Sequence, residues 1–163
     1  MKALFIGGVK SGKSFNAEQY TLALNPTEKP LYLVMSEAFD DELKKRVELH
    51  KQKRGDHFVT IEEPLSLVGE IESHSSVVLV ECVTLWINNM LHYGHSQAEI
   101  IEHIEAVLAL PNDLVFVHND VGTGIMPDNK FARQYIDISG IVAQKIAIQC
   151  DEVYHCIAGG LRN

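Results

Sequence analysis

Short apolar runs alternate along the chain with longer segments in which apolar residues recur at helical spacing. Short apolar runs bounded by polar or turn-forming residues are typical of buried strands, whereas recurrence every three or four residues, as in Ile100, Ile104, Val107 and Leu108, is typical of amphipathic helices. The predicted strands are Ala3–Gly7, Leu31–Met35, Phe58–Ile61, Val77–Cys82, Leu114–Asn119 and Val153–Ile157. The predicted helices are Lys13–Leu24, Asp40–Gln52, Leu65–Glu72, Thr84–Leu91, Gln97–Leu108 and Phe131–Gln149.

This alternation of strands and helices predicts an α/β fold. It requires crossover connections, which favour a mostly parallel sheet flanked by helices on both faces. The 163 residues are enough for one substantial core, so we expect a single domain over residues 1–163. Ligands of such sheets bind beyond the carboxyl ends of the strands. Functional residues should therefore gather in Gly7–Ser14, Ser36–Asp41, Glu81–Trp86 and Asn119–Pro127.

The first of these segments carries a complete phosphate-binding motif, G-x-x-x-x-G-K-[ST]. Its glycines allow the backbone to curl so that N–H groups point at phosphate oxygens, and the helix that follows adds its positive end. A glycine-rich turn is the alternative, but a strand precedes the motif and a helix follows it. We therefore predict a P-loop NTPase fold, with Lys13 as a catalytic residue on the phosphates and the Ser14 hydroxyl on Mg²⁺. The residues expected to contact phosphate are Gly7, Gly8, Val9, Lys10, Ser11, Gly12, Lys13 and Ser14.

A P-loop needs an acidic partner for the metal on a nearby strand. Glu81 ends an apolar run and is the first candidate, binding Mg²⁺ directly or through water. The alternative is that its carboxylate caps the next helix, at Thr84. Asp120, which follows another predicted strand, is a second candidate for the metal.

The predicted second helix starts acidic and ends basic, an order that complements the helix dipole and fits a solvated helix. Leu43, Val47 and His50 share one face of it, however, and Arg46 and Arg54 flank that face. His50 is therefore predicted to face inward with cations nearby. A neutral imidazole there could attack a phosphate as a nucleophile. A purely structural histidine is the alternative.

The composition narrows the choice of partners and location. The formal net charge of −8 argues against non-specific nucleic-acid binding, which needs a basic surface. No apolar stretch approaches the length of a membrane span, and the first apolar run is too short for a signal peptide, so we expect a cytoplasmic protein. The three cysteines do not indicate a disulfide framework, and Cys82 and Cys156 are expected to be buried thiols.

Several irregular motifs together resemble the bifunctional adenosylcobinamide kinase/adenosylcobinamide-phosphate guanylyltransferase family of cobalamin biosynthesis. The resemblance covers nearly the whole chain and includes motifs that P-loop proteins in general do not share. The matching segments are Gly7–Ser14, Arg46–Lys51, His57–Glu62, Glu81–Asn89, Asn119–Pro127 and Arg133–Gly140 with Gln144. The sequence departs from the family pattern at Lys10, Phe58, Glu81 and Asp120, which keep charge or bulk, and at Ala143, which does not.

The resemblance implies two reactions on one chain. The chain would phosphorylate adenosylcobinamide with GTP or ATP, and would then transfer GMP from GTP to adenosylcobinamide phosphate through a guanylylated His50. It also implies a homo-oligomer, specifically a trimer, while the P-loop motif itself indicates Mg²⁺ as cofactor. A P-loop small-molecule kinase or a nucleotide switch without guanylyl transfer is the alternative. Besides the phosphate loop, the residues expected to bind nucleotide are Val34, Met35, Ser36, Lys51, Gln52, Lys53, Arg54, Glu62 and Glu81.

Overall fold

The computed structural model describes residues 1–36 and 41–163, with the side chains of Leu43 and Val47 also outside the description. The predicted helix start at Asp40, and most of the predicted functional segment after Ser36, therefore lie outside the described residues. Among the described residues, no helix is both long enough and apolar enough to cross a membrane.

Within the described ranges, seven strands form a single sheet in the order β3-β2-β4-β5-β1-β6-β7. Neighbouring strands are parallel except β6 and β7, which form an antiparallel hairpin at one edge. The predicted mostly parallel sheet is therefore confirmed. The strands are β1 Lys2–Gly7, β2 Leu31–Val34, β3 Val59–Glu62, β4 Val78–Glu81, β5 Leu114–Asn119, β6 Glu152–Ile157 and β7 Gly160–Arg162.

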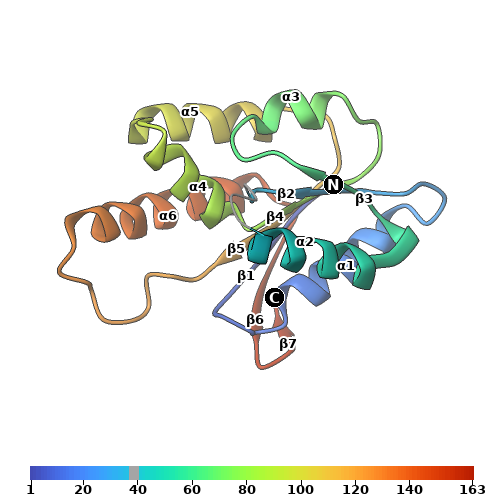
Figure 1. Ribbon diagram of the computed structural model, residues 1–163, viewed down its shortest axis with the longest axis horizontal. Helices are drawn as coiled ribbons and strands as arrows, with labels where there is room; N and C mark the ends of the chain where they lie inside the picture. Colours follow the sequence, from blue (N-terminus) through green and yellow to red (C-terminus); the bar gives the residue numbers. More distant parts are fainter. Residues whose placement is uncertain (37–40) are drawn as a thin grey trace.

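Helices cover both faces of the sheet, with α1 and α2 on one side and α3 to α6 on the other (Figure 1). Alternate strand residues enter two cores: Leu4 and Phe116 pack with α3 to α6, whereas Phe5 and Val117 pack on the α1 side. Burial on both faces explains why β1, β2, β4 and β5 are nearly continuous apolar runs. The helices are α1 Lys13–Leu24, α2 Asp41–Arg54, α3 Leu67–Glu72, α4 Val83–His92, α5 Gln97–Leu108 and α6 Lys130–Gln149, with a short 3₁₀ helix at Gly55–His57.

The bounds of β5 and α5 agree with the prediction, whereas the end of β4 does not. The strand stops at Glu81, and Cys82 has φ 65, a left-handed conformation that breaks the extended backbone before α4. The expectation that Cys82 belongs to a strand is therefore wrong, and Cys82 is half-buried where a buried thiol was expected. Cys156 is buried as expected, and all three cysteines are free thiols.

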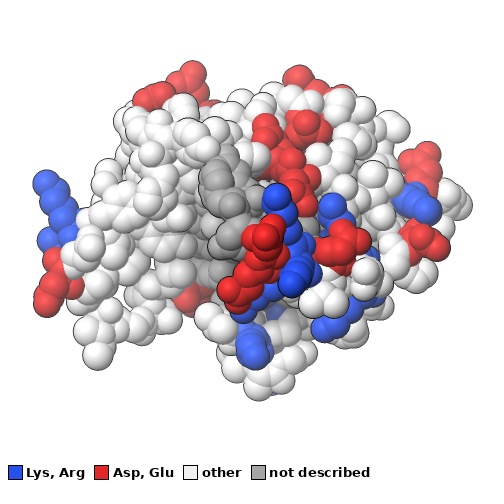
Figure 2. Space-filling model, viewed as in Figure 1, with Lys and Arg blue, Asp and Glu red and all other residues white. Residues whose placement is uncertain are grey.

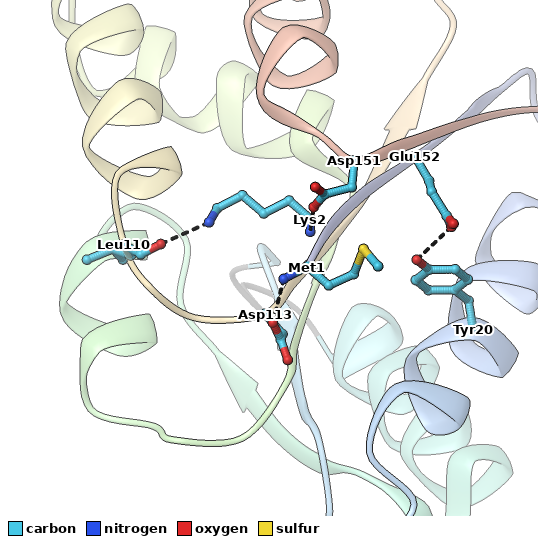
Figure 3. A network of polar contacts seen from close by, with 7 residues as sticks. All are labelled: Met1, Lys2, Tyr20, Leu110, Asp113, Asp151 and Glu152. Atoms are coloured by element: carbon cyan, nitrogen blue, oxygen red, sulfur yellow. Dashed lines mark hydrogen bonds and ion pairs between the residues drawn. The ribbon is translucent and has the colours of Figure 1, made fainter.

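Polar contacts join the amino ends of the central strands (Figure 3). The amino group of Met1 donates to Asp113 Oδ1 at 2.7 Å. Lys2 bonds in two directions, with its backbone N–H donating to Asp151 Oδ2 at 2.7 Å and its Nζ donating to the Leu110 carbonyl at 3.0 Å. These bonds fix the starts of β1, β5 and β6 relative to one another and leave the opposite, carboxyl edge of the sheet for the site.

Candidate functional site

The phosphate loop connects β1 to α1 at the carboxyl edge of the sheet. It curls back on itself, with the N–H of Ser11 donating to the Gly8 carbonyl at 3.3 Å and Gly12 in the left-handed region at φ 89. Lys13 is nearly buried, with 8% of its surface exposed, and its Nζ donates to the same Gly8 carbonyl at 3.0 Å. The ammonium group is therefore held over the loop, where a phosphate could replace the carbonyl as its partner.

A cavity of about 180 Å³ lies beside the loop and brings together residues from α1, β2, α2 and β4. It combines two hydroxyls, two carboxylates, an imidazole and a guanidinium around an apolar wall. Its lining residues are Ser14, Glu18, Tyr32, Val34, His50, Arg54 and Glu81.

Ser14 and Glu81 meet in this cavity. The Ser14 Oγ donates to Glu81 Oε1 at 2.9 Å, and the second carboxylate oxygen, Oε2, is buried without a hydrogen-bond partner among the described residues. Burial raises the pKa of Glu81, opposed by the hydrogen bond from Ser14 and by the charge of Lys13. A hydroxyl beside an unsatisfied buried carboxylate oxygen is a donor set that fits Mg²⁺, which prefers oxygen ligands.

The alternative role of Glu81 as a cap for the next helix is not supported. Helix α4 begins at Val83, with Cys82 at the N-cap position, while the Glu81 carboxylate bonds to Ser14 instead. Asp120, the second metal candidate, lines a separate cavity of about 80 Å³ together with His118. The contact with the P-loop serine therefore favours Glu81 over Asp120.

His50 borders the same cavity from α2, but its side chain is exposed rather than buried. The predicted inward face also included Leu43 and Val47, whose side chains lie outside the described residues. Charged side chains of both signs cover α2 (Figure 2), as its sequence predicts. Lys51 pairs with Glu62 on β3, with 3.4 Å between Nζ and Oε1.

Two lining residues, Glu18 and Tyr32, were not predicted from the sequence. The Arg54 guanidinium lies 3.8 Å from the centre of the Tyr32 ring, a cation–π contact, and Arg54 Nε is buried without a partner among the described residues. Burial raises the pKa of Glu18, opposed by hydrogen bonding to Tyr32 and by the charge of Arg54. Glu18 follows Ser14 by one helical turn, and that spacing is the signal that could have identified it.

Not all of the other predicted nucleotide-binding residues present their side chains to the cavity. Met35 is fully buried and offers only its backbone, where its carbonyl accepts a bond from Asn89 Nδ2 at 2.7 Å. The Ser36 Oγ is buried without a partner among the described residues. Gln52 and Lys53 are exposed and do not line the cavity, because the helix turns them away from the face that carries His50 and Arg54. Their role in nucleotide binding stays a prediction.

Comparison with solved structures supports the class that the loop and sheet define. The flagellar accessory protein FlaH of Methanocaldococcus jannaschii matches with a TM-score of 0.51 and 11% identity, covering 98% of this chain and 74% of that one. A KaiC-like protein of Pyrococcus horikoshii matches with a TM-score of 0.50 and 12% identity, covering 94% and 69% of the two chains. The chain is a protein of the P-loop NTPase fold.

Comparison with sequences identifies the family. The model of the cobinamide kinase / cobinamide phosphate guanyltransferase family matches residues 3–162. The bifunctional adenosylcobalamin biosynthesis proteins CobP of Pseudomonas aeruginosa and CobU of Escherichia coli are 34% and 35% identical to this chain. Each match covers 98% of this chain, and the matches cover 94% and 97% of the two relatives. The chain belongs to the cobinamide kinase / cobinamide phosphate guanyltransferase family, a family of enzymes in cobalamin biosynthesis.

Proposed function

We propose that this enzyme phosphorylates adenosylcobinamide and then transfers GMP from GTP to adenosylcobinamide phosphate through a guanylylated His50. One observation carries the proposal: His50 borders the same cavity as Ser14 and Glu81. The nucleophile and the phosphate loop can therefore act on one bound nucleotide. The two activities named for the family supply the two reactions.

In the first reaction, the γ-phosphoryl group of GTP or ATP passes to a hydroxyl of adenosylcobinamide. The loop N–H groups and Lys13 hold the phosphates and stabilise the charge on the transferring group. Ser14 and Glu81 would hold Mg²⁺, which neutralises charge on the phosphate oxygens when bound. The buried, unpartnered Glu81 Oε2 supports this role, since an ion would satisfy it.

In the second reaction, an imidazole nitrogen of His50 attacks the α-phosphorus of GTP. The bond from that phosphorus to the bridging oxygen breaks, and pyrophosphate leaves. A phosphate oxygen of adenosylcobinamide phosphate then attacks the same phosphorus, breaking the P–N bond and giving adenosylcobinamide-GDP. Splitting the transfer through a covalent intermediate is the usual logic of nucleophilic catalysis. The exposed position of His50 supports it, because two substrates must reach the ring in turn.

The proposed nucleotide site comprises the whole phosphate loop, the cavity residues and their neighbours on α2 and β3. Val34 and Arg54 line the cavity itself. Lys51 and Glu62 form an ion pair, so a nucleotide would have to insert beside this pair or separate it. We further propose that the enzyme is cytoplasmic and a homotrimer of the 18.2 kDa chain, which light scattering of the purified protein would test.

Product analysis of two variants tests the proposal. His50→Asn should make adenosylcobinamide phosphate but no adenosylcobinamide-GDP, because no nucleophile remains while the phosphate loop is intact. Lys13→Ala should fail at the phosphorylation step. Supplying adenosylcobinamide phosphate directly isolates the second step in both variants. Wild-type formation of adenosylcobinamide-GDP by His50→Asn would overturn the role of His50 as the covalent nucleophile.

A further inference from the structure

The hairpin of β6 and β7, at the end of the described chain, contacts the phosphate loop. The turn between its strands contains Ala158 and Gly159, and the N–H of Gly159 donates to the Ser11 carbonyl at 2.8 Å. The Asn16 side chain joins both parts, with Nδ2 donating to the Gly12 carbonyl at 2.9 Å and to the Gly159 carbonyl at 3.3 Å. Two successive carbonyls of the phosphate loop are therefore bound from outside it.

The two segments also touch at the level of their backbones. A Cβ atom added to Gly12 would lie 2.9 Å from the Gly159 Cα, closer than real Cβ atoms approach other atoms. Ala158 and Gly159 both have left-handed backbones, with φ 49 and 81, so the turn has a specific shape. The antiparallel pair Ile157 and Gly160 closes the hairpin on either side of this turn.

These contacts determine the direction in which the loop N–H groups point. In a planar trans peptide, the C=O and N–H of one unit point in opposite directions. The Ser11 carbonyl shares its peptide unit with the N–H of Gly12, and the Gly12 carbonyl shares its unit with the N–H of Lys13. The hairpin binds the Ser11 carbonyl, and Asn16 binds the Gly12 carbonyl through both its backbone N–H, at 3.0 Å, and its Nδ2. Holding both carbonyls in this way aims both N–H groups in the opposite direction, toward the concave side of the loop where phosphate binds.

We propose that the Ala158–Gly159 turn and Asn16 are positioning elements of the phosphate loop, which hold its N–H groups in the orientation that binds nucleotide. The inference rests on the proposed function, because it assumes that nucleotide phosphates occupy this loop. Since both reactions use the same loop, loss of the contact should weaken nucleotide binding in both.

Gly159→Ala tests the turn, with Gly94→Ala as a matched control. Both glycines have left-handed backbones, with φ 81 and 85, and a Cβ added to either meets no atom within 4 Å. The two alanines therefore introduce the same backbone strain, but Gly94 follows α4, away from the phosphate loop. Their melting temperatures should fall by similar amounts.

Calorimetric titration with a non-hydrolysable GTP analogue and Mg²⁺ should separate the two variants. Gly159→Ala should bind about tenfold more weakly than the wild type, the factor expected when alanine strain displaces the turn. Gly94→Ala should bind normally. The KM for nucleotide should rise in both reactions of Gly159→Ala, with a smaller change in kcat. Gly159→Asn should recover part of the loss, because asparagine tolerates the left-handed region better than alanine.

Equal binding by Gly159→Ala and Gly94→Ala would overturn the inference. If Gly159→Ala does not fold, Asn16→Leu carries the test. Leucine has a similar size and adds no charge near the phosphates, but it cannot donate to the Gly12 and Gly159 carbonyls. Binding should therefore weaken, and wild-type binding would contradict the role. Failure of the wild type itself to bind nucleotide would instead remove the proposed function, and this inference with it.

Discussion

Polar groups are paired at the edge of the sheet where the strands begin, the amino edge, and are often unpaired at the edge where the strands end, the carboxyl edge. At the amino edge, the charged ends of Met1 and Lys2 each have a partner within 3.0 Å (Figure 3). Six buried side-chain atoms lack a partner among the described residues, and five of them lie at the carboxyl edge: Ser11 Oγ, Ser36 Oγ, Arg54 Nε, Glu81 Oε2 and His118 Nδ1. The sixth, His103 Nε2, lies on α5. Buried polar atoms without hydrogen bonds destabilise a fold. Their concentration at one edge indicates that this edge is built for ligands.

Two carboxylates show the same contrast through their pKa values. A hydrogen bond from the Lys2 backbone N–H lowers the pKa of Asp151 at the amino edge. Burial raises the pKa of Glu81 at the carboxyl edge. Folding therefore favours the charged form of the first group and disfavours that of the second. The amino edge stabilises its charges by itself, whereas Glu81 would gain most from a bound cation.

Replacing one lysine by alanine at each edge should give the largest difference in catalytic rate between the two edges. Lys2→Ala and Lys13→Ala each remove one bond to a backbone carbonyl, and both bonds are 3.0 Å long. Lys13→Ala should lower the rate of phosphoryl transfer by about 10²–10³-fold. It removes the positive charge that stabilises the transferring group in a water-poor site. Lys2→Ala should keep the wild-type rate. A steady-state assay with adenosylcobinamide checks both, and normal turnover by Lys13→Ala would refute its assignment.

Glu81→Gln should weaken the response to Mg²⁺. Glutamine keeps the shape of the side chain but removes the charge that a hard cation prefers. The Mg²⁺ concentration at half-maximal activity should rise by about 10- to 100-fold, the usual range for disturbed metal sites. An unchanged midpoint would shift the metal role to Asp120.

The same Glu81→Gln change should stabilise the protein without ligands. Because the folded pKa of Glu81 is raised, ionising this carboxylate destabilises the folded state as pH rises above its ordinary value of 4.5. The advantage of glutamine in urea unfolding should therefore grow as the pH rises above 4.5. Asp151→Asn should instead lower the stability above pH 3.8, since the pKa of Asp151 is lowered in the folded state. Equal stability of Glu81→Gln and wild type at pH 8 would contradict the assignment of a buried, destabilising charge to Glu81.

Tyr20→Phe should have the smallest effect. The Tyr20 hydroxyl donates to Glu152 Oε2 at 2.7 Å near the amino edge (Figure 3), and its loss leaves the cavity untouched. The melting temperature should fall by about 1–3 °C, as expected for one hydrogen bond. Both activities should stay at the wild-type level. A loss of activity at constant stability would show that the two edges are not independent.

The sequence predicted the strands and helices whose signal lies within one continuous segment. The strand Leu114–Asn119 has the predicted bounds because burial on both faces makes it a continuous apolar run. The helix Gln97–Leu108 has them because it combines helical spacing with a capping box at Ser96 and Glu99. The strand Gly160–Arg162 was missed, since its residues are exposed and carry no pattern. Hairpin pairing alone makes it a strand.

The candidate site also contains residues that a local motif predicts and residues that only the packing brings together. The contiguous P-loop motif located Lys13 and Ser14, and the acidic end of an apolar run located Glu81. Tyr32 could not be recognised, because a tyrosine in an apolar run predicts a core residue and its contact with Arg54 depends on the packing of α2 against β2. The contact of Gly159 with the phosphate loop was equally hidden, since it joins the two ends of the chain.

The most direct test of the account is the intact mass of the protein after incubation with GTP and Mg²⁺. The wild type should gain the mass of one GMP, which acid removes and alkali leaves, because protonating the ring nitrogen makes imidazole a good leaving group. His50→Asn should gain nothing. An adduct that persists on His50→Asn would move the nucleophile elsewhere, with His57 the nearest alternative in the sequence. No adduct on the wild type would contradict the guanylyl-transfer mechanism.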